Sequence, residues 1–334
     1  MQVASQDYSS LSLLIAGCGS IGRRHTRVLR EMGVADITAC DPSAEQRNGF
    51  QALYPSVVLH DNYETALKSR RFDAVYVLTP PHLHIDMIRR GLDQNCHVFV
   101  EKPLAYISNG IEALMELAES RNKKVMVGFC FRYHETLVEA KKLLESGTIG
   151  RLVSIRALMG EHFPEVQPNY KNMYYSEYFG AFELVHDLDL ALWYAGQSIK
   201  EVSCVYGTFS DIDIQSPDTV EFLIQFEDRL TASVHLDFFQ RPRRRVMELI
   251  ATHGVITVDF ASWEEAVLSF YTADSRKWMT KTIPTRRDDM FRDENACFLN
   301  AVLDGSDISC TMREALKTVK IIERFYKPFS GEHP

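Results

Sequence analysis

LLIAGCGSIGRRH, residues 13–25, is the most informative stretch of this chain. An apolar run typical of a buried strand leads into Gly17, Gly19 and Gly22, a G-x-G-x-x-G pattern that opens a helix. The first glycine permits a tight turn, the second lets a pyrophosphate approach the backbone, and the third lets the helix pack closely on the strand. Because the first N–H groups of a helix have no backbone partner, an anion is favoured there. The pattern predicts a dinucleotide-binding loop, with an ordinary glycine-rich turn as the alternative.

The composition is that of an ordinary globular protein. The 334 residues suffice for two domains; 46% are apolar and 25% are charged. The formal net charge of -8 argues against a nucleic-acid partner or an anionic membrane surface. The 7 cysteines are odd in number and none has C-x-x-C spacing, so we expect no disulfide framework, no zinc site and a cytoplasmic location. We see neither a signal peptide nor the ~20 consecutive apolar residues of a membrane span.

The first part of the chain alternates between strand and helix patterns. The clearest helix pattern covers 109–121, where Asn109 is a candidate N-cap. This alternation predicts an α/β fold with a doubly wound parallel sheet of Rossmann type, and its ligand should lie at the carboxyl ends of the strands. The apolar runs that predict its strands are 11–17, 36–40, 72–78, 97–100 and 124–128.

The pattern changes after Gly128. Helical patterns at 135–146 and 180–195 precede strict alternation of apolar and polar residues, which predicts a large, mainly antiparallel open sheet. Thr311 and Glu314 form a capping box at the start of the last helix. We therefore expect a nucleotide-binding domain over 1–129 and an α+β domain for substrate binding and oligomerisation over 130–334. The last helix, about 311–325, is expected to pack back on the first domain, and the cleft between the domains is the expected ligand site.

Asp41 ends the second predicted strand. A carboxylate at this place can accept hydrogen bonds from both hydroxyls of an adenosine ribose, and it repels a 2′-phosphate. Asp41 therefore favours NAD over NADP, although Arg47 nearby is able to contact a phosphate. Asp41 is also a candidate helix cap, with Pro42 at the first helical position, and the two roles are compatible.

Two further places carry candidate chemistry. Lys102, in HVFVEKPLA (97–105), follows a predicted strand at the edge of the sheet where a nicotinamide should lie, with an ordinary surface lysine as the alternative. In GAFELVHDLDLALWYAG (180–196), Glu183, His186 and Asp189 are spaced three apart and share one side of a helix. The alternative there is a solvated helix face with one satisfied histidine.

The chain resembles, over nearly its whole length, the glucose–fructose oxidoreductase / inositol dehydrogenase / rhizopine catabolism family of NAD(P)-dependent oxidoreductases. The matching stretches are AGCGSIGRRH (16–25), LTPPHLH (78–84), EKPLA (101–105), GFCFRYHE (128–135) and FELVHDLDLALWYAG (182–196). The resemblance implies that Lys102 contacts the nicotinamide ribose and the substrate hydroxyl, that His186 is the acid/base, and that Asp189 contacts the substrate. It places Pro80 and His84 along the cofactor, and it places Arg132 and Tyr133 at the substrate pocket. The other candidates for cofactor binding are Ser20, Ile21, Thr79 and Glu101.

The sequence departs from the family pattern at two positions. Many members carry an aspartate four residues before the histidine, where this chain has Phe182. Glu183 is the candidate replacement for that aspartate and is predicted to be a catalytic residue. Pro81 stands where many members have asparagine.

The candidate residues suit the oxidation of a secondary alcohol. A lysine cation stabilises the developing alkoxide, and a histidine, which titrates near neutral pH, takes the proton. Glu183 is placed to orient His186, and no clustered ligand set suggests a metal.

The irregular stretch 160–180 is a candidate substrate lid, with an interface or core loop as the alternative. The side chains in it that suit sugar recognition are Glu161, His162, Tyr170, Tyr174 and Tyr175. The basic run Arg241–Arg245 is consistent with a contact to a substrate anion, with a subunit edge or with a solvated face.

The sequence thus predicts an NAD-dependent oxidoreductase that acts on a hydroxyl of a sugar, amino sugar, nucleotide-sugar or inositol. The alternatives are an NAD-using glycosidase-like hydrolase and a non-catalytic nucleotide-binding regulator on the same scaffold. We expect Lys102 to face His186 across the nicotinamide ring. We also expect a homodimer or homotetramer formed through the C-terminal sheet.

Overall fold

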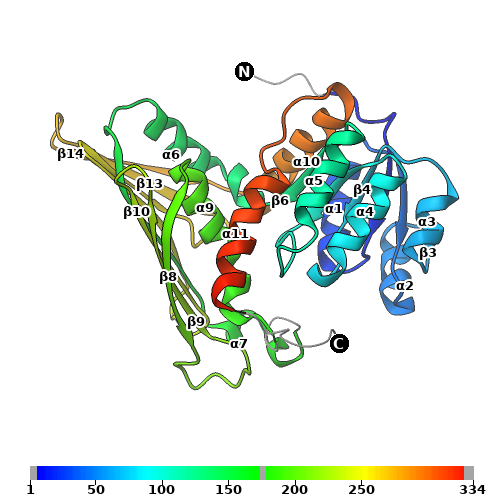
Figure 1. Cartoon of the computed structure of the whole chain (residues 1–334), viewed down its shortest axis with the longest axis horizontal. Coiled ribbons are helices and arrows are strands. Elements are labelled where there is room, and N and C mark those ends of the chain that lie inside the picture. The colour runs from blue at the N-terminus through cyan, green and yellow to red at the C-terminus, as the bar shows by residue number, and fades with distance from the viewer. Residues whose placement is uncertain (1–5, 174–177, 327–334) are drawn as a thin grey trace. The chain divides into compact units, whose positions relative to one another are not determined.

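The computed structural model describes residues 6–173 and 178–326, which fall into two compact units. The first unit contains residues 6–130 and 291–320, and the second contains residues 131–173, 178–290 and 321–326. Each unit is built around one sheet, as Figure 1 shows. The chain therefore returns to the first unit after it has built most of the second.

The sheet of the first unit is parallel throughout, with the order β3-β2-β1-β4-β5-β6. This confirms the predicted Rossmann-type sheet. The central strand β4 is buried along its whole length, which explains why the parallel strands appear in the sequence as continuous apolar runs. The strands are β1 (Ser12–Ala16), β2 (Asp36–Cys40), β3 (Val58–His60), β4 (Ala74–Val77), β5 (His97–Glu101) and β6 (Val125–Gly128).

Helices connect these strands and complete the core. Phe298, from the long helix α10, packs edge-on against Tyr76 and Phe99, with ring centroids 5.5 and 5.7 Å apart. A residue near the C-terminus thus fills the core of the N-terminal sheet. The helices are α1 (Ser20–Glu31), α2 (Ala44–Leu53), α3 (Tyr63–Ser69), η1 (Pro81–Leu83), α4 (His84–Asp93), α5 (Ile111–Ser120), α10 (Arg287–Asp304) and α11 (Met312–Phe325).

The helix caps expected from the sequence are confirmed for α11 and are wrong for α5 and α2. The capping box of α11 is confirmed, because Glu314 accepts from the Thr311 N–H at 2.9 Å and the Thr311 hydroxyl accepts from the Glu314 N–H at 3.3 Å. The predicted cap of α5 by Asn109 is wrong: the N-cap residue is Gly110, in the left-handed region with φ 85°. The cap of α2 by Asp41 is also wrong, since the helix begins one residue after Ser43, whose hydroxyl accepts from the Gln46 N–H.

The second unit contains an eight-stranded sheet with the order β14-β13-β12-β11-β7-β10-β9-β8. Only β7 and β10 run parallel, so the predicted mainly antiparallel sheet is confirmed. The strands are β7 (Leu152–Gly160), β8 (Ile199–Gly207), β9 (Thr219–Phe226), β10 (Thr231–Asp237), β11 (Arg244–Ala251), β12 (Gly254–Asp259), β13 (Glu265–Thr272) and β14 (Lys277–Pro284).

Two helices of the second unit pack on one face of this sheet. The helix α6 lies against β12 and β13, and α9 lies against β7 and β10. The opposite face keeps alternate residues exposed, as β9 shows with Glu221, Leu223 and Gln225. The helices and turns are η2 (Cys130–Tyr133), α6 (Glu135–Glu145), α7 (Phe163–Val166), η3 (Tyr170–Asn172), η4 (Gly180–Glu183) and α9 (Val185–Ala195).

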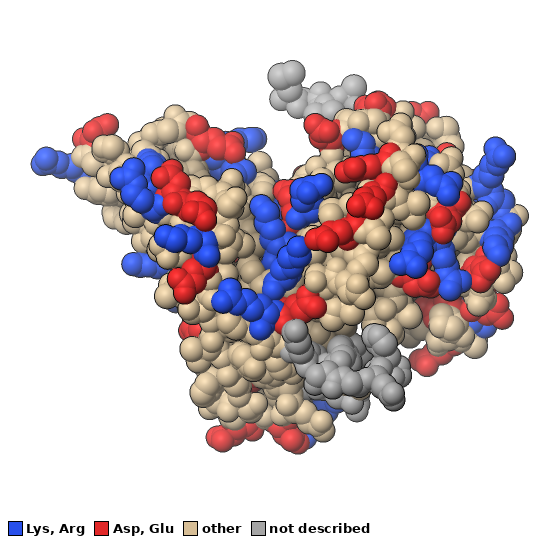
Figure 2. Space-filling view, in the orientation of Figure 1, with Lys and Arg blue, Asp and Glu red and all other residues tan. Residues whose placement is uncertain are grey.

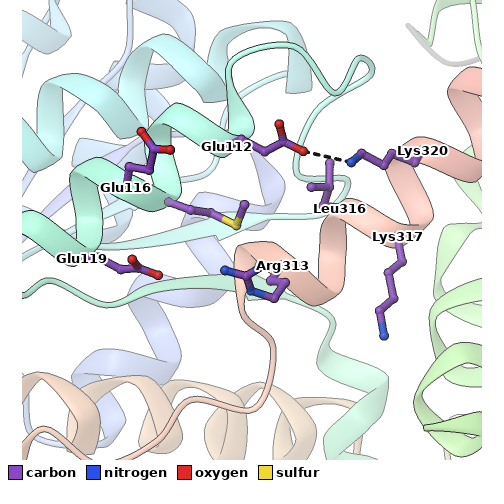
Figure 3. A pocket seen from close by; sticks show the side chains of 8 residues that line it. Glu112, Glu116, Glu119, Arg313, Leu316, Lys317 and Lys320 are labelled. Atoms are coloured by element: carbon purple, nitrogen blue, oxygen red, sulfur yellow. Dashed lines mark hydrogen bonds and ion pairs between the residues drawn. The ribbon is translucent and has the colours of Figure 1, made fainter. Parts of the chain in front are cut away.

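A groove of about 460 Å³ lies between α5 and the first half of α11, and its two walls carry opposite charges. Figure 3 shows an ion pair across it, from Lys320 Nζ to Glu112 Oε1 at 3.0 Å. Figure 2 shows acidic and basic side chains interspersed over the visible face. None of the helices in residues 6–173 and 178–326 has the length and apolar content of a membrane crossing. The groove residues are Glu112, Met115, Glu116, Glu119, Arg313, Leu316, Lys317 and Lys320.

Candidate functional site

The three glycines of the loop have the geometry that an anion site requires. Gly17 has φ +109°, and a Cβ on it would lie 2.4 Å from the Leu78 carbonyl oxygen. A Cβ on Gly22 would lie 2.0 Å from the Gly17 carbonyl oxygen, so this glycine lets α1 pack on the turn. Gly19, the N-cap residue of α1, has no atom within 4 Å of a Cβ position. The loop therefore leaves space at the helix N-terminus, beside Ser20 and Ile21, for a phosphate to approach the backbone.

Three candidate loops meet at one edge of the parallel sheet. The strands β1, β4 and β5 are neighbours, and the sheet order changes direction between β1 and β4. Gly17, Thr79 and Lys102 follow the carboxyl ends of these three strands. Such a switch point is where doubly wound sheets bind their ligands.

Asp41 joins the second strand to the glycine loop. One of its carboxylate oxygens accepts from the Cys18 N–H and the other from the Ser43 N–H, both at 2.8 Å. The Arg47 side chain lies at the same bend, where it donates to the Asp41 carbonyl oxygen at 2.7 Å. The carboxylate is thus fixed beside the loop, and each oxygen keeps lone pairs for further donors.

His84 connects two of these loops from within the core. Its side chain is buried, with Nε2 at 2.8 Å from the Thr79 carbonyl oxygen and Nδ1 at 3.0 Å from that of Pro103. Burial lowers the pKa of His84. This residue therefore holds the Thr79–Pro80 segment against the segment that follows Lys102, and its ring faces backbone carbonyls.

The backbone of Lys102 is anchored by a short chain of polar side chains. Glu101 accepts from the Lys102 N–H through Oε2 at 3.0 Å, and its Oε1 lies 3.2 Å from Nε2 of the buried His25. On the other side of the ring, Asn295 contacts His25 Nδ1 at 3.2 Å. Glu101, a predicted cofactor-binding residue, uses both of its carboxylate oxygens in contacts within this unit. His25 ends the quoted glycine stretch, and its direct neighbours are polar, so no sequence pattern marks it as a buried residue.

Glu294 lies next to Asn295 and is fully buried. Within the described residues, neither of its carboxylate oxygens has a hydrogen-bond partner. Burial, reinforced by the nearby Glu101, raises the pKa of Glu294 well above its ordinary value. The first unit thus holds a buried carboxyl group whose surroundings favour its neutral form.

In the second unit, Arg132 and Asp189 form a bidentate ion pair. The guanidinium Nε and Nη2 donate to the two carboxylate oxygens at 2.8 and 2.7 Å, and both side chains are buried. Asp189 lies on α9, where Asp187 and Asp189 are buried, while His186, which directly precedes Asp187, is partly exposed. Tyr133, next to Arg132, is also partly exposed. Of these candidates, His186 and Tyr133 are accessible, and Arg132 and Asp189 face each other.

The structure corrects the expected helix around Glu183. The helix α9 begins at Val185, and Glu183 ends the preceding 3-10 turn, so Glu183 and His186 do not share a helix face. Phe182, at the position of the family aspartate, is buried in an aromatic cluster and stacks on Tyr326 at 4.8 Å. The backbone leaves the helical path here because Gly180, at φ +53°, packs against the Pro217 carbonyl oxygen.

Glutamates of the stretch 160–180 form ion pairs with arginines of the basic run Arg241–Arg245. Arg243 contacts Glu161 at 3.0 Å, and Arg241 contacts Glu165 at 2.7 Å. Arg241 and Arg243 thus form ion pairs with carboxylates of their own unit. Tyr170 packs edge-on against a buried phenylalanine, at 5.7 Å from Phe163. Tyr174 and Tyr175 lie outside the described residues.

Comparisons with known proteins agree with this architecture. Residues 11–129 match the oxidoreductase family model with an NAD-binding Rossmann fold, and residues 137–257 match the GFO/IDH/MocA C-terminal domain. D-xylose 1-dehydrogenase (NADP(+)) 2 of Haloferax volcanii is 25% identical over 80% of this chain and 81% of its own length. The inositol 2-dehydrogenase/D-chiro-inositol 3-dehydrogenase of Lacticaseibacillus casei is 26% identical over 58% of this chain, and the match spans only 55% of that enzyme.

Two solved structures share the whole fold. UDP-N-acetylglucosamine 3-dehydrogenase from Acidithiobacillus ferrooxidans aligns with a TM-score of 0.78 at 19% identity, covering 95% of this chain and 96% of that one. Scyllo-inositol dehydrogenase from Lactobacillus casei, solved with bound NAD(H) and scyllo-inositol, aligns with a TM-score of 0.78 at 20% identity and covers 93% and 94% of the two chains. With both of its units matched by the family, this chain belongs to the GFO/IDH/MocA oxidoreductases, whose N-terminal domain is an NAD-binding Rossmann fold.

Proposed function

We propose that this chain is an NAD-dependent dehydrogenase or reductase acting on a secondary alcohol or ketone of a sugar, amino sugar, nucleotide-sugar or inositol. The observation that carries the proposal is the meeting of Gly17, Thr79 and Lys102 at the switch point of the parallel sheet. The substrate class is supported by the relatives, which are named for xylose, inositol and UDP-N-acetylglucosamine. All three substrates carry secondary hydroxyls on a polyhydroxylated carbon skeleton.

The cofactor's fit is supported by the open space at Gly19 and by the fixed carboxylate of Asp41. The N-terminus of α1 would hold the pyrophosphate, and Asp41 would accept from the adenosine ribose hydroxyls. When bound, NAD supplies the acceptor for the hydride. We expect calorimetry to find tighter binding of NAD than of NADP, and the opposite order would overturn the role of Asp41.

Lys102 is proposed to stabilise the developing charge on the substrate oxygen, and His186 is proposed to transfer the proton. The Lys102 ammonium stabilises the developing negative charge on the substrate oxygen, and its backbone is held in place through Glu101. His186, partly exposed at the first turn of α9, takes the proton in oxidation and returns it in reduction. Arg132 and Tyr133 are proposed to line the substrate pocket, Arg132 through its pair with Asp189.

The test is a screen of sugars, inositols and sugar acids with NAD, followed as NADH absorbance. With an active substrate in hand, His186→Gln should lower turnover by about 100- to 10,000-fold, the usual contribution of a general acid/base. Lys102→Met should lower turnover while NAD affinity is largely kept. Lys124→Met is the matched control, because this partly buried lysine precedes β6 at the opposite edge of the same sheet.

Each alternative function gives a different result in this screen. A hydrolase that uses NAD transiently would release sugar without accumulating NADH. A nucleotide-binding regulator would bind NAD equally well and would show no turnover to lose in the variants at Lys102 and His186. Full activity of either variant would contradict the proposed catalytic roles.

We also propose that the chain forms a homodimer or homotetramer through the open face of the eight-stranded sheet. That face exposes large apolar side chains, among them Val205 at 63%, Leu223 at 60% and Trp278 at 57%. Exposed apolar area on this scale is typical of an interface. Sedimentation equilibrium should find an oligomer, and Leu223→Glu should dissociate it; a monomeric wild type would refute this part of the proposal.

A further inference from the structure

A second bidentate ion pair lies beside the candidate base and is not part of any proposed ligand contact. Arg245, on β11, donates through Nε to Asp187 Oδ1 at 3.1 Å and through Nη2 to Oδ2 at 2.7 Å. The side chains are 5% and 0% exposed. Asp187 directly follows His186 in the first turn of α9. This ion pair thus fixes β11 to α9 at the residue next to the candidate base.

Arg245 reaches the histidine by a second route. Its guanidinium lies over the ring of Phe131, with Cζ 3.7 Å from the ring centroid. The ring of Phe131 in turn packs against the His186 imidazole, with centroids 4.9 Å apart and planes at 65°. One guanidinium therefore constrains His186 on two sides, through the backbone of its neighbour and through the face of an aromatic ring.

Stability alone does not account for this arrangement. Well-packed apolar residues in place of a buried ion pair often leave a protein equally stable or more stable. A planar, bidentate guanidinium fixes direction as well as position, and it stacks on an aromatic ring. The pair is therefore better suited to orienting a neighbouring group than to supplying folding energy.

We infer that Arg245 is a positioning residue, which holds the imidazole of His186 in the orientation for proton transfer through Asp187 and Phe131. The inference rests on the proposed role of His186. It also gives the unassigned basic run Arg241–Arg245 a function within its own unit.

The most direct test is Arg245→Lys. This substitution keeps the charge opposite Asp187 and loses the planar, two-point contact. We expect kcat to fall by about 100-fold, the effect of a displacement of about 1 Å in a catalytic group, with the KM for NAD unchanged. Arg70→Lys is the matched control, because Arg70 makes an exposed bidentate pair with Asp36 at 2.6 Å in the other unit. The control should keep the wild-type kcat.

A second variant separates misfolding from misorientation. Arg245→Met combined with Asp187→Leu removes both buried charges, so we expect cooperative thermal unfolding as in the wild type, with a kcat as low as in Arg245→Lys. Wild-type turnover in this folded variant would overturn the inference.

The last measurement combines Arg245→Lys with His186→Gln. If Arg245 acts through His186, the lysine substitution lowers kcat no further once the histidine is gone. An equal loss in both backgrounds would mean that Arg245 acts by another route. If His186→Gln alone leaves kcat unchanged, the proposed function of His186 fails. If His186→Gln abolishes turnover while Arg245→Lys does not affect it, only the positioning inference fails.

Discussion

Replacing His235 with glutamine should remove a stabilisation that the wild type loses in mildly alkaline solution. His235 lies on β10 with its Nε2 at 2.8 Å from Asp237 Oδ2 and its Nδ1 in contact with Glu221. The hydrogen bond that the imidazole donates to Asp237, helped by the contact with Glu221, raises the pKa of His235 from 6.5 to about 9. Because the folded chain holds this proton more tightly than the unfolded chain, the stabilisation is complete below pH 6.5 and is lost as the pH rises through about 9.

The size of the effect follows from the burial of the three groups. At ~1.36 kcal/mol per pKa unit, the raised pKa corresponds to at most about 3 kcal/mol. Asp237 is 1% exposed and His235 25%, but Glu221 is 48% exposed, so solvent screens its part of the interaction. We therefore expect His235→Gln to lower the free energy of unfolding by about 1–2 kcal/mol at about pH 6 and by nearly nothing at about pH 10.

Urea unfolding of the wild type and the variant at both pH values measures this difference directly. His253→Gln, the same exchange in the exposed turn between β11 and β12, is the control for the substitution itself. If the destabilisation by His235→Gln is the same at both pH values, His235 is not held protonated by its two carboxylates, and the reasoning fails.

Three further substitutions test other features of the structure. Burial raises the pKa of Glu294, so the wild type loses stability as the pH rises above 4.5; Glu294→Gln should withstand more urea than the wild type at about pH 8 and equal it at about pH 4. Lys320→Ala breaks an ion pair with Glu112 in which the side chains are 55% and 70% exposed, and calorimetry should find a change below about 0.5 kcal/mol. Asn62 caps α3 by accepting from the Thr65 N–H at 3.0 Å, so Asn62→Ala should cost about 1 kcal/mol in chemical unfolding.

The parallel sheet could be predicted because its strands are buried on both faces. Such strands are continuous apolar runs, and β1, β2, β4, β5 and β6 all lie where these runs occur. The short edge strand β3 was missed, since it has only three residues and none of them is buried. In the second unit, alternation marked β9 and β10. It did not mark β14, which is exposed at nearly every position.

The helix α10 was missed for a different physical reason. Its core-facing side includes Glu294 and Asn295, both fully buried, so no clean apolar stripe appears in its sequence. In the candidate site, the loops of the first unit were predictable from local patterns. The pairs that hold the site were not predictable, because Arg245 and Asp187 are 58 positions apart and only the packing of α9 on the eight-stranded sheet brings them together.

The return of residues 291–320 to the first unit has a consequence for the order in which the protein is made. Tyr8 donates to Asn300 at 2.8 Å, and Phe298 completes the aromatic core around Tyr76. The ribosome therefore releases the whole eight-stranded sheet before the side chains that finish the N-terminal core have emerged. Domains generally fold one after another from the N-terminus during synthesis. Here the nucleotide-binding unit is the first to emerge from the ribosome, but its core is the last to be completed.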